Sequence, residues 1–249
     1  MSVDRIKQAL TDVELAYTNW LKKLNIINNN KRYSEKAKRY SASSAGLCPA
    51  KHYFKYQDTP QMPPNESDFA KMRLGTIVHE DIQTALEMMY KGDNVTCELP
   101  ISFGNVKGHL DVVIDISDES KECILIDIKT MAAFPCSKKY GHDKDPNPAP
   151  WNMMPLATYA NGLKHQYGYK NVYMYLLNYN KNTSVMRFEE VEEHWIDEAL
   201  KYWKNVDEYV AWYSKRLKNE GKHASHQPMY KWECKYCPYE YVCQEKGED

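Results

Sequence analysis

The chain has 249 residues, of which 43% are hydrophobic and 27% are charged, and its formal net charge is −1. These values are typical of a globular protein with one large or two modest cores, and they exclude a general attraction to polyanions, so that any nucleic-acid contact must come from local patches. The N-terminus shows no apolar leader, and no apolar run approaches the roughly 20 residues that span a bilayer. We therefore expect a soluble, cytoplasmic protein that does not contact a membrane.

Two amphipathic helices are predicted in the first ninety residues. Apolar spacing of three and four predicts a helix over 4–28 that buries Ile6, Leu10, Val13, Tyr17, Trp20, Leu21 and Leu24. The Pro-rich connection from Thr59 to Asn65 should be extended and exposed. A second helix over 68–90 is expected to bury Phe69, Met72, Val78, Ile82, Leu86 and Met89.

Basic residues are concentrated between these two helices. From Lys31 to Lys55 the chain carries seven Lys and Arg residues against Glu35 alone, interleaved with aromatic residues. Such a run can bind phosphates and stack bases, and the members retained as candidate nucleic-acid contacts are Arg39, Lys51 and, farther along, Trp151. The chain has 20 tyrosines, so most of them must simply pack. The acidic residues that balance this basic run lie mostly in 189–198, which we expect to be a solvated surface.

The rest of the chain predicts strands followed by alternating helix and strand. Three strands, over 96–103, 106–116 and 122–130, should form a meander, and 134–150 should be a long loop. A helix over 153–167 and a strand over 172–179 precede a helix over 193–220, which should turn inward Trp195, Ile196, Leu200, Trp203, Val206, Val210 and Leu217. This order predicts an α/β fold with a central mixed sheet flanked by helices.

Charged side chains interrupt two of these apolar strands. Alternation puts Asp127 and Lys129 on the same face of their strand, and the preceding strand carries Asp111. Two carboxylates on adjacent strands can form a cation site of hard oxygen ligands that suits Mg²⁺ or Mn²⁺, with the lysine holding or deprotonating a water. Taken alone, a strand that ends in Asp-Ile-Lys is more often a solvated rim.

A histidine on the second helix can complete this site. Gly75 and His79 are four residues apart and therefore share a helix face, where glycine permits a close approach of the backbone and leaves the imidazole free to reach a metal on the sheet. A lone histidine on an apolar helix face is usually a core residue. The joint occurrence of His79 with the acids on the strands is what favours a metal site.

The cysteines indicate a second metal site. Cys234, Cys237 and Cys243 have C-x2-C-x5-C spacing, and Cys48 is the only plausible fourth ligand. One remote and three clustered cysteines favour a [4Fe-4S] cluster over Zn²⁺, although His223 and His226 keep the zinc alternative open. Of the other three cysteines, Cys97 and Cys123 should be buried in the core and Cys136 should lie in a loop.

In this order, an early cysteine, G-x-x-x-H, G-x-x-D, D-x-K, an aromatic helix position and C-x2-C-x5-C extend from about Ser43 to Cys243. The chain thereby resembles the PD-(D/E)XK nuclease superfamily, and within it the RecB-like exonucleases with an iron-sulfur cluster, such as the CRISPR-adaptation nucleases and AddB-type nuclease domains. The resemblance implies one nuclease domain with a restriction-endonuclease-like core over 68–192, an N-terminal segment 1–67 and a cysteine module 193–249.

The resemblance also implies roles for single residues. His79, Asp111, Asp127 and the carbonyl of Ile128 would bind Mg²⁺ or Mn²⁺, and Lys129 would position the attacking water. Tyr159 would be the tyrosine of a Q-x-x-x-Y motif, in which Pro155 replaces the glutamine, so either that contact is lost or Gln166 supplies it. The cluster ligands would be Cys48, Cys234, Cys237 and Cys243, and we expect Arg73, near His79, to contact phosphate.

The activity implied is that of a metal-dependent deoxyribonuclease, an exonuclease acting on single-stranded or free DNA ends in phage replication, recombination, repair or CRISPR adaptation, with protein partners in such a complex. An alternative is a catalytically weak DNA-end-binding subunit that retains the fold, which the missing glutamine favours slightly. A zinc-ribbon protein without nuclease activity is a third reading, but it leaves the central strands unexplained.

Overall fold

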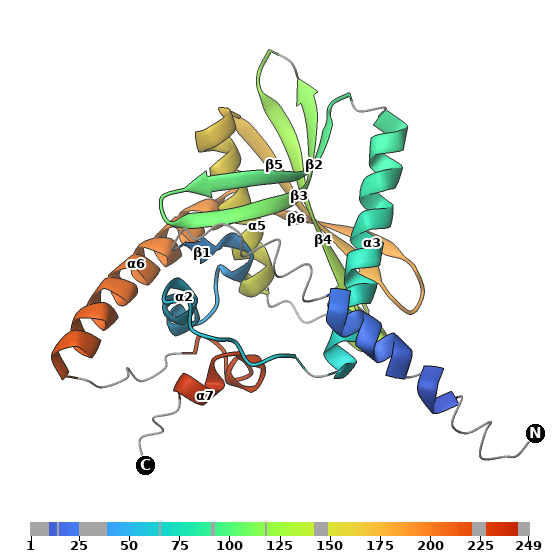
Figure 1. Ribbon diagram of the computed structural model, residues 1–249. Coiled ribbons are helices and arrows are strands. Elements are labelled where there is room, and N and C mark those ends of the chain that lie inside the picture. The colour runs from blue at the N-terminus through green and yellow to red at the C-terminus, as the bar shows by residue number, and fades with distance from the viewer. Residues whose placement is uncertain are drawn as a thin grey trace, which may run out of the picture.

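The computed structural model describes residues 10–13, 15–24, 39–64, 66–90, 93–117, 119–141, 149–220 and 228–243. Its helices flank a mixed six-stranded sheet, as the sequence predicted (Figure 1). Besides the helical residues 10–13 and 15–24, the elements are β1 (Tyr40–Ser41), η1 (Ala42–Ser44), α2 (Pro49–Tyr56), α3 (Glu66–Tyr90), β2 (Val95–Phe103), β3 (Val106–Ser117), β4 (Glu122–Met131), α4 (Ala133–Tyr140), α5 (Pro150–Gly162), the π-helix η2 (Leu163–Tyr167), β5 (Asn171–Asn180), β6 (Met186–Val191), α6 (His194–Glu220), η3 (Cys234–Tyr236) and α7 (Glu240–Cys243).

The strands follow the order β1-β3-β4-β5-β6, and β2 pairs with β3. The antiparallel pairs β2–β3 and β3–β4 confirm the predicted meander. β4 and β5 are parallel, as expected for strands joined by a helical crossover, here through α4 and α5. The single helix predicted over 153–167 is α5 continued by η2.

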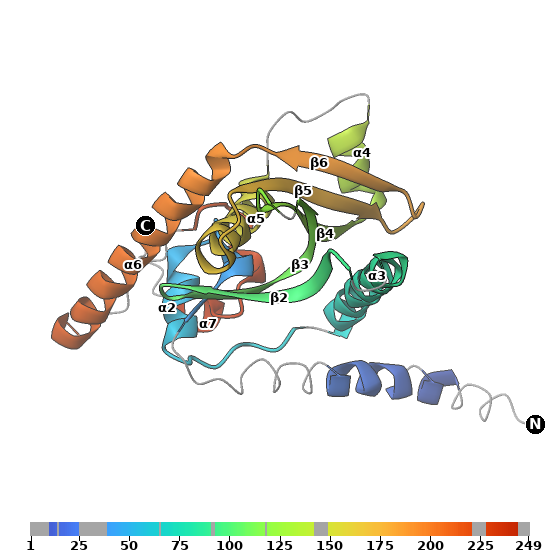
Figure 2. The same ribbon diagram turned by 90° about the horizontal axis from the view of Figure 1, so that it is seen from above.

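Two apolar layers cover opposite faces of the sheet, because alternate residues of each strand point to opposite sides. On β4, Cys123 and Leu125 pack into the larger core with α2, α5 and α6, whereas Ile126 and Ile128 face α3 (Figure 2). The central helix α5 is apolar on nearly all sides and is buried from Pro155 to Gly162.

The aromatic part of the basic run builds this larger core. Tyr40, Tyr53 and Phe54 are 3–4% exposed, and the ring of Tyr40 stacks on Trp203 of α6 with centroids 5.8 Å apart. These three rings therefore pack α2 and β1 against α6 and are not exposed for stacking on bases. Residues 31–38 of the run lie outside the described part of the chain.

Two predicted segments have a different structure. The expected loop over 134–150 contains all of α4 but its first residue, and also the first residue of α5, while 142–148 lie outside the described ranges. Cys136 is a buried helical residue with 9% exposure. The acidic stretch that begins at residue 189 starts inside the edge strand β6, which the sequence did not predict, and continues into α6. In β6 only Val191 is buried, and the apolar residues Met186 and Phe188 are exposed, so the strand lacks a continuous buried face.

Several apolar residues expected in the helix stripes are exposed. In the N-terminal helix, Leu10, Val13, Tyr17 and Trp20 are 52–67% exposed, and of the described stripe residues Leu21 alone is buried. Residues 4–9, 14 and 25–28 of the predicted helix lie outside the described ranges. Met72 and Met89 of α3 and Leu200 of α6 are also exposed. The extended, largely exposed connection over 59–64 agrees with the prediction. Among the described helices, none combines the length and the hydropathy needed to cross a membrane.

Candidate active site and cysteine pocket

The first part of the candidate site lies where β3 and β4 separate. Their pairing runs from Ser117–Glu122 to Val112–Ile126, and the next residues, Asp111 and Asp127, follow where the ladder ends. Here the Asp111 side chain replaces a main-chain acceptor, because the N–H group of Ile128 donates to its Oδ2 atom at 2.7 Å. The carboxylate of Asp111 is thereby fixed beside the backbone of β4.

The helix α3 brings His79 to the same place. Its Nδ1 atom lies 3.5 Å from Oδ2 of Asp111, and the backbone of Ile128 is a further hydrogen-bonding partner of the ring. Gly75, one turn earlier, faces Thr130 of β4, but a Cβ atom built there would lie 3.5 Å from the Thr130 hydroxyl, which is ordinary contact. The packing therefore does not require glycine at this position, contrary to the expectation of a close backbone approach.

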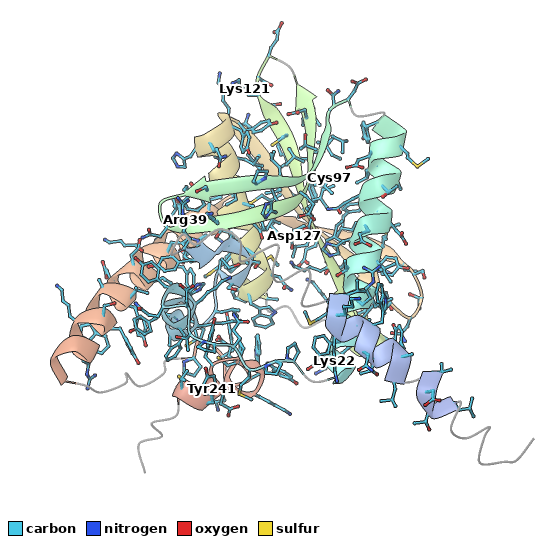
Figure 3. All side chains as sticks on the ribbon, in the orientation of Figure 1. Lys22, Arg39, Cys97, Lys121, Asp127 and Tyr241 are labelled. Atoms are coloured by element: carbon cyan, nitrogen blue, oxygen red, sulfur yellow. The ribbon has the colours of Figure 1, made fainter. Side chains whose placement is uncertain are left out.

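Asp127 and Lys129 project together, as alternation predicted. Nζ of Lys129 lies 2.6 Å from Oδ2 of Asp127, and Asp127 is 3% exposed. Figure 3 places Asp127 in the middle of the molecule, well away from Tyr241 in the C-terminal module. The two side chains thus form an ion pair, which balances the charge of the buried Asp127 carboxylate.

Burial and like charge control the electrostatics. Burial, together with the charge of Asp127, raises the pKa of Asp111 well above its ordinary value. Burial and the ammonium of Lys129 lower the pKa of His79, so its ring is neutral and available as a ligand near pH 7. For Lys129, burial would lower the pKa, but Asp127 and Asp111 outweigh burial and raise it, so the ammonium stays charged.

The donor set fits a hard divalent cation. In the described part of the chain, no three His, Cys, Asp or Glu side chains are drawn together as they would be around a bound ion. The chemistry of His79, Asp111 and Asp127 is nevertheless suitable, because an ion beside the two carboxylates would offset the repulsion that raises the pKa of Asp111.

Sequence reasoning missed Gln83 and Glu98, which border this site. Nε2 of Gln83, one turn after His79 on α3, donates to the main-chain oxygen of Asp111 at 2.9 Å and to Oε1 of Glu98 at 3.1 Å. The only signal in the sequence was the helical spacing of Gln83 from His79, because a bond to a main-chain atom leaves no motif.

The structure places Tyr159 in the core rather than at the surface. It is 4% exposed, and its ring lies against Gly108 of β3, where an added Cβ would come within 2.7 Å of the Tyr159 ring and of Ala42. Pro155 is buried within α5, and its ring carries no hydrogen-bond donor in any environment. Gln166 accepts a bond from the Ser102 N–H at 2.8 Å, so its amide oxygen is used at the far end of β2.

The four candidate nucleic-acid contacts do not gather at one point. Arg73 lies 3.5 Å from Glu80 on α3, and Arg39 donates to the Ser102 hydroxyl. Lys51 lines the cysteine pocket described next, and Trp151 belongs to a ring cluster in which its centroid lies 4.7 Å from Tyr230 and 5.5 Å from Trp232. Lys51 and Trp151 are thus associated with the C-terminal module, whereas Arg73 is on the helix of His79.

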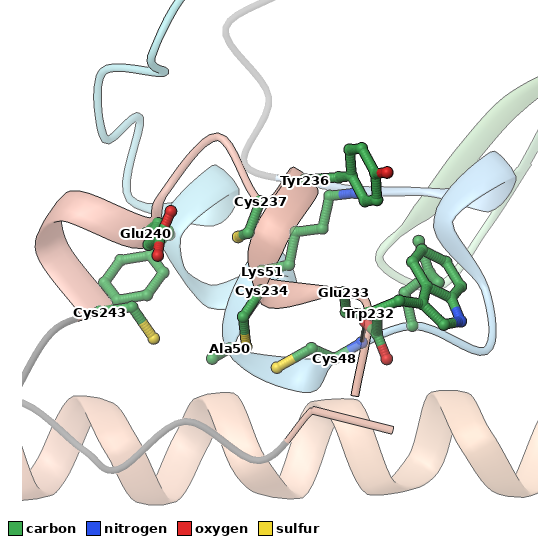
Figure 4. Close-up of a pocket in the computed structure, with 12 residues that line it drawn as sticks. Cys48, Ala50, Lys51, Trp232, Glu233, Cys234, Tyr236, Cys237, Glu240 and Cys243 are labelled. Atoms are coloured by element: carbon green, nitrogen blue, oxygen red, sulfur yellow. Dashed lines mark hydrogen bonds between the residues drawn. The ribbon is translucent and has the colours of Figure 1, made fainter. Parts of the chain in front are cut away.

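One cavity of about 150 Å³ is lined by the four cysteines that the sequence singled out (Figure 4). They are Cys48, Cys234, Cys237 and Cys243. Burial, with the neighbouring Cys48, Cys237 and Cys234, raises the pKa of Cys243 to about 12. The module is held in place by Glu233, whose carboxylate accepts the N–H groups of Cys48 at 2.7 Å and of Tyr230 at 2.8 Å. The other zinc candidates, His223 and His226, lie outside the described residues.

The other cysteines have separate environments. Cys123 is fully buried in the sheet, as predicted. Cys97, predicted to be buried in the core, is only partly buried against the apolar layer under α3, where burial and the nearby Glu87 raise its pKa to about 11. Neither lines the cavity, so the cavity collects only the cysteines at the two ends of the fold.

Comparison with known proteins gives one family match. The sequence profile of the PD-(D/E)XK nuclease superfamily matches residues 85–244, which include Asp111, Asp127, Lys129 and the three C-terminal cysteines. A search among curated proteins finds no match. His79 and Cys48 precede the matched range, so their assignment depends on the geometry above.

Solved structures share the fold at low identity. An alkaline exonuclease from Laribacter hongkongensis superposes with a TM-score of 0.51 and 14% identity, covering 75% of this chain and 94% of that one. A protein from Eubacterium rectale, provisionally assigned as an exonuclease, superposes with a TM-score of 0.50 and 16% identity, covering 82% and 90%. At these identities the comparison establishes the shared fold.

Proposed function

The chain belongs to the PD-(D/E)XK nuclease superfamily, and from this premise we propose that it is a metal-dependent deoxyribonuclease that removes nucleotides from single-stranded DNA ends. The observation that carries the proposal is the meeting of His79, Asp111, Asp127 and Lys129 where β3 and β4 separate. If Asp-Ile-Lys were only a solvated strand end, Asp127 would not be buried to 3% exposure beside a second acid.

In this proposal His79, Asp111, Asp127 and the carbonyl of Ile128 hold Mg²⁺ or Mn²⁺. The ion would acidify a water and neutralise the charge that develops on the phosphate. Lys129 keeps its proton beside Asp127 and orients the attacking water through its ammonium. The N–H of Ile128 keeps the Asp111 carboxylate in place, so this ligand is aligned before the substrate binds.

We assign the cysteine pocket to a [4Fe-4S] cluster that has a structural role. Its four cysteines, with sequence separations that favour a cluster over zinc, line one apolar cavity. Thiols with a raised pKa, such as Cys243, would otherwise remain protonated, so metal binding must release protons and would contribute to folding. Iron and acid-labile sulfide in anaerobically purified protein, against stoichiometric zinc, decide between the two metals.

The path of the DNA is proposed from the remaining contacts. Trp151 and Lys51 near the cysteine module would bind bases and phosphate of a single strand, and Arg73 would bind phosphate near His79, whereas Arg39 lies apart from both. We place the protein in the cytoplasm, in replication, recombination, repair or CRISPR adaptation, where protein partners would deliver DNA ends.

A nuclease assay tests the proposal. Anaerobically purified protein is given end-labelled single- and double-stranded DNA with Mg²⁺, Mn²⁺ or EDTA. We expect mononucleotide release from single strands with either ion, and a loss of at least about 100-fold in rate for Asp127→Ala and Lys129→Ala in folded protein. Full cleavage by either variant would overturn the site assignment.

The second candidate is a DNA-end-binding subunit that lacks strong catalysis. It is favoured by Pro155, which replaces the expected glutamine, and by the burial of Tyr159, which leaves α5 without either motif side chain at the surface. Tight binding of DNA ends without nucleotide release, in protein that retains both metal centres, would favour the DNA-end-binding function over the nuclease.

A further inference from the structure

The side-chain amide of Gln83 joins three elements beside the candidate active site. Gln83 lies on α3, one turn after His79, and is 8% exposed. Its Nε2 atom donates to the main-chain oxygen of Asp111 on β3 at 2.9 Å and to Oε1 of Glu98 on β2 at 3.1 Å. Both N–H bonds of the amide are therefore used.

Asp111 is consequently held at two points. Gln83 binds its main-chain oxygen, and the N–H of Ile128 binds its carboxylate at 2.7 Å. The ladder between β3 and β4 stops at Val112–Ile126, so the strand pairing on that edge does not extend to Asp111. The position of Asp111 relative to α3 therefore depends on Gln83 as well as on the sheet.

Glu98 is held in an unusual conformation opposite Asp111. The pairs Cys97–Val112 and Leu99–Leu110 bring Glu98 level with Asp111, and the φ angle of Glu98 is +52°. This left-handed region is rarely adopted by a residue with a long side chain, and such residues persist only when their surroundings hold them. The bond from Gln83 is one contact that holds the Glu98 carboxylate toward the site.

We propose that Gln83 is a positioning residue that aligns His79 with Asp111 for one divalent ion, with the Glu98 carboxylate held next to that ion to add negative charge. The inference rests on the proposed function, since it takes His79 and Asp111 as ligands. Gln83 and His79 share α3, so a bond from Gln83 to the backbone of Asp111 fixes the helix at the distance that brings the imidazole to 3.5 Å from the carboxylate.

The change Gln83→Leu removes both hydrogen bonds at similar volume. Residues that orient metal ligands typically change metal affinity by about 10- to 100-fold when they are replaced. We therefore expect at least about a tenfold rise in the dissociation constant for Mn²⁺. The matched control is Ile82→Ala, which removes packing from the neighbouring position of α3 without touching a polar group, and should lower the melting temperature while leaving Mn²⁺ affinity unchanged.

Glu98→Gly separates charge from fold stability. Glycine adopts a φ of +52° without strain, so the melting temperature should hold or rise, whereas the loss of the carboxylate should weaken Mn²⁺ binding severalfold. A residue that served only to shape the hairpin would show the first effect without the second.

The experiment titrates full-length protein with Mn²⁺ in the absence of DNA and follows free Mn²⁺ by electron paramagnetic resonance. Melting curves are recorded for every variant in EDTA. Unchanged Mn²⁺ affinity in Gln83→Leu, with binding abolished by Asp111→Asn, would overturn the positioning role and leave the proposed function standing. Wild-type protein that binds no Mn²⁺ would overturn the proposed function and, with it, the role of Gln83.

Discussion

At the scale of single residues, Lys129 and Asp127 depend on each other. The ammonium lies 2.6 Å from a carboxylate that is 3% exposed and that also faces Asp111. Lys129→Met keeps the length of the side chain and removes its charge, leaving two buried acids without a cation. We expect the free energy of unfolding in EDTA to fall by about 1–3 kcal/mol and Mg²⁺ to restore part of the loss, measured by urea denaturation.

The control for this variant is Lys121→Met, in the turn before the same strand, where the side chain is exposed (Figure 3). It should change neither the unfolding free energy nor its dependence on Mg²⁺ by more than about 0.5 kcal/mol. If Lys129→Met were as stable as wild type in EDTA, Asp127 would not need its partner, and the charge balance described for the site would be wrong.

Gly108 is a residue at which packing demands glycine. A Cβ atom there would lie 2.7 Å from both Ala42 and the ring of Tyr159, and Ala42 can retreat only by moving its backbone. Gly108→Ala should therefore lower the free energy of unfolding by about 1–3 kcal/mol or more. Gly75→Ala, whose Cβ would meet only an ordinary contact, should be neutral or stabilising by up to about 1 kcal/mol. Equal effects of the two changes would contradict the packing at Gly108.

Residue patterns predicted the charged cluster because strand alternation and helix spacing fix which side chains share a face. They could not predict Gln83 and Glu98, since one bonds to a main-chain oxygen and the other depends on a left-handed backbone angle inside a strand. They also suggested Gln166 as a substitute for Pro155, because sequence distance does not reveal that its amide caps Ser102.

At the scale of elements, apolar runs were sufficient to predict β2 to β5 and the helices α3 and α6. The sequence did not predict β6, because it is an edge strand with one buried residue and two glutamates. The sequence did not predict α4, because Pro135 and the consecutive Lys138 and Lys139 suggested a loop. In the structure Cys136 is buried, and the Tyr140 hydroxyl accepts a hydrogen bond from Asn178 at 2.6 Å, which fastens the helix to β5. Tertiary contacts, rather than local periodicity, therefore decide these two elements.

The docking of α2 on α6 carries a pH dependence. His52 is 1% exposed, and its Nε2 atom lies 2.6 Å from the Tyr202 hydroxyl of α6. Burial, with the charges of Lys51 and Lys55, lowers the pKa of His52 to about 3. Its folded pKa lies below that of the unfolded chain, so between about pH 6.5 and 3 the unfolded chain binds the extra proton and stability is lost as the pH falls.

We expect His52→Phe, which packs but does not titrate, to reduce the slope of stability against pH by about 1.4 kcal/mol per pH unit below pH 6. Urea denaturation at several pH values between 7 and 5 measures both slopes in the same metal state. The variant will be less stable at pH 7 because it loses the bond to Tyr202, so the slope is the informative quantity. Identical slopes would show that His52 protonates in the folded protein.

At the scale of the whole molecule, the segment 48–62 and the C-terminal cysteine module are closed on one another. Besides the bond from Cys48 to Glu233, the N–H of Met62 donates to the Pro238 carbonyl at 2.9 Å, and Gln61 donates to the Tyr239 hydroxyl at 2.8 Å. The exposed connection over 59–64 is therefore also a docking strip for the C-terminal module. The sequence predicted the pairing of these segments from the cysteines alone, but not the polar contacts that accompany it.

This closure predicts that the cysteine pocket stabilises the whole fold. Cys48→Ser should remove bound metal and lower the melting temperature by about 10 °C or more, since metal binding contributes several kcal/mol and each kcal/mol corresponds to about 2–4 °C in a chain of this size. Cys136→Ser is the matched control, because Cys136 has the same 9% exposure as Cys48 but lies on α4, outside the cavity. Calorimetry with iron and zinc analysis measures both effects, and a Cys48→Ser variant that kept its metal and melting temperature would show that the C-terminal module is held to residues 48–62 by Glu233 and the other polar contacts alone.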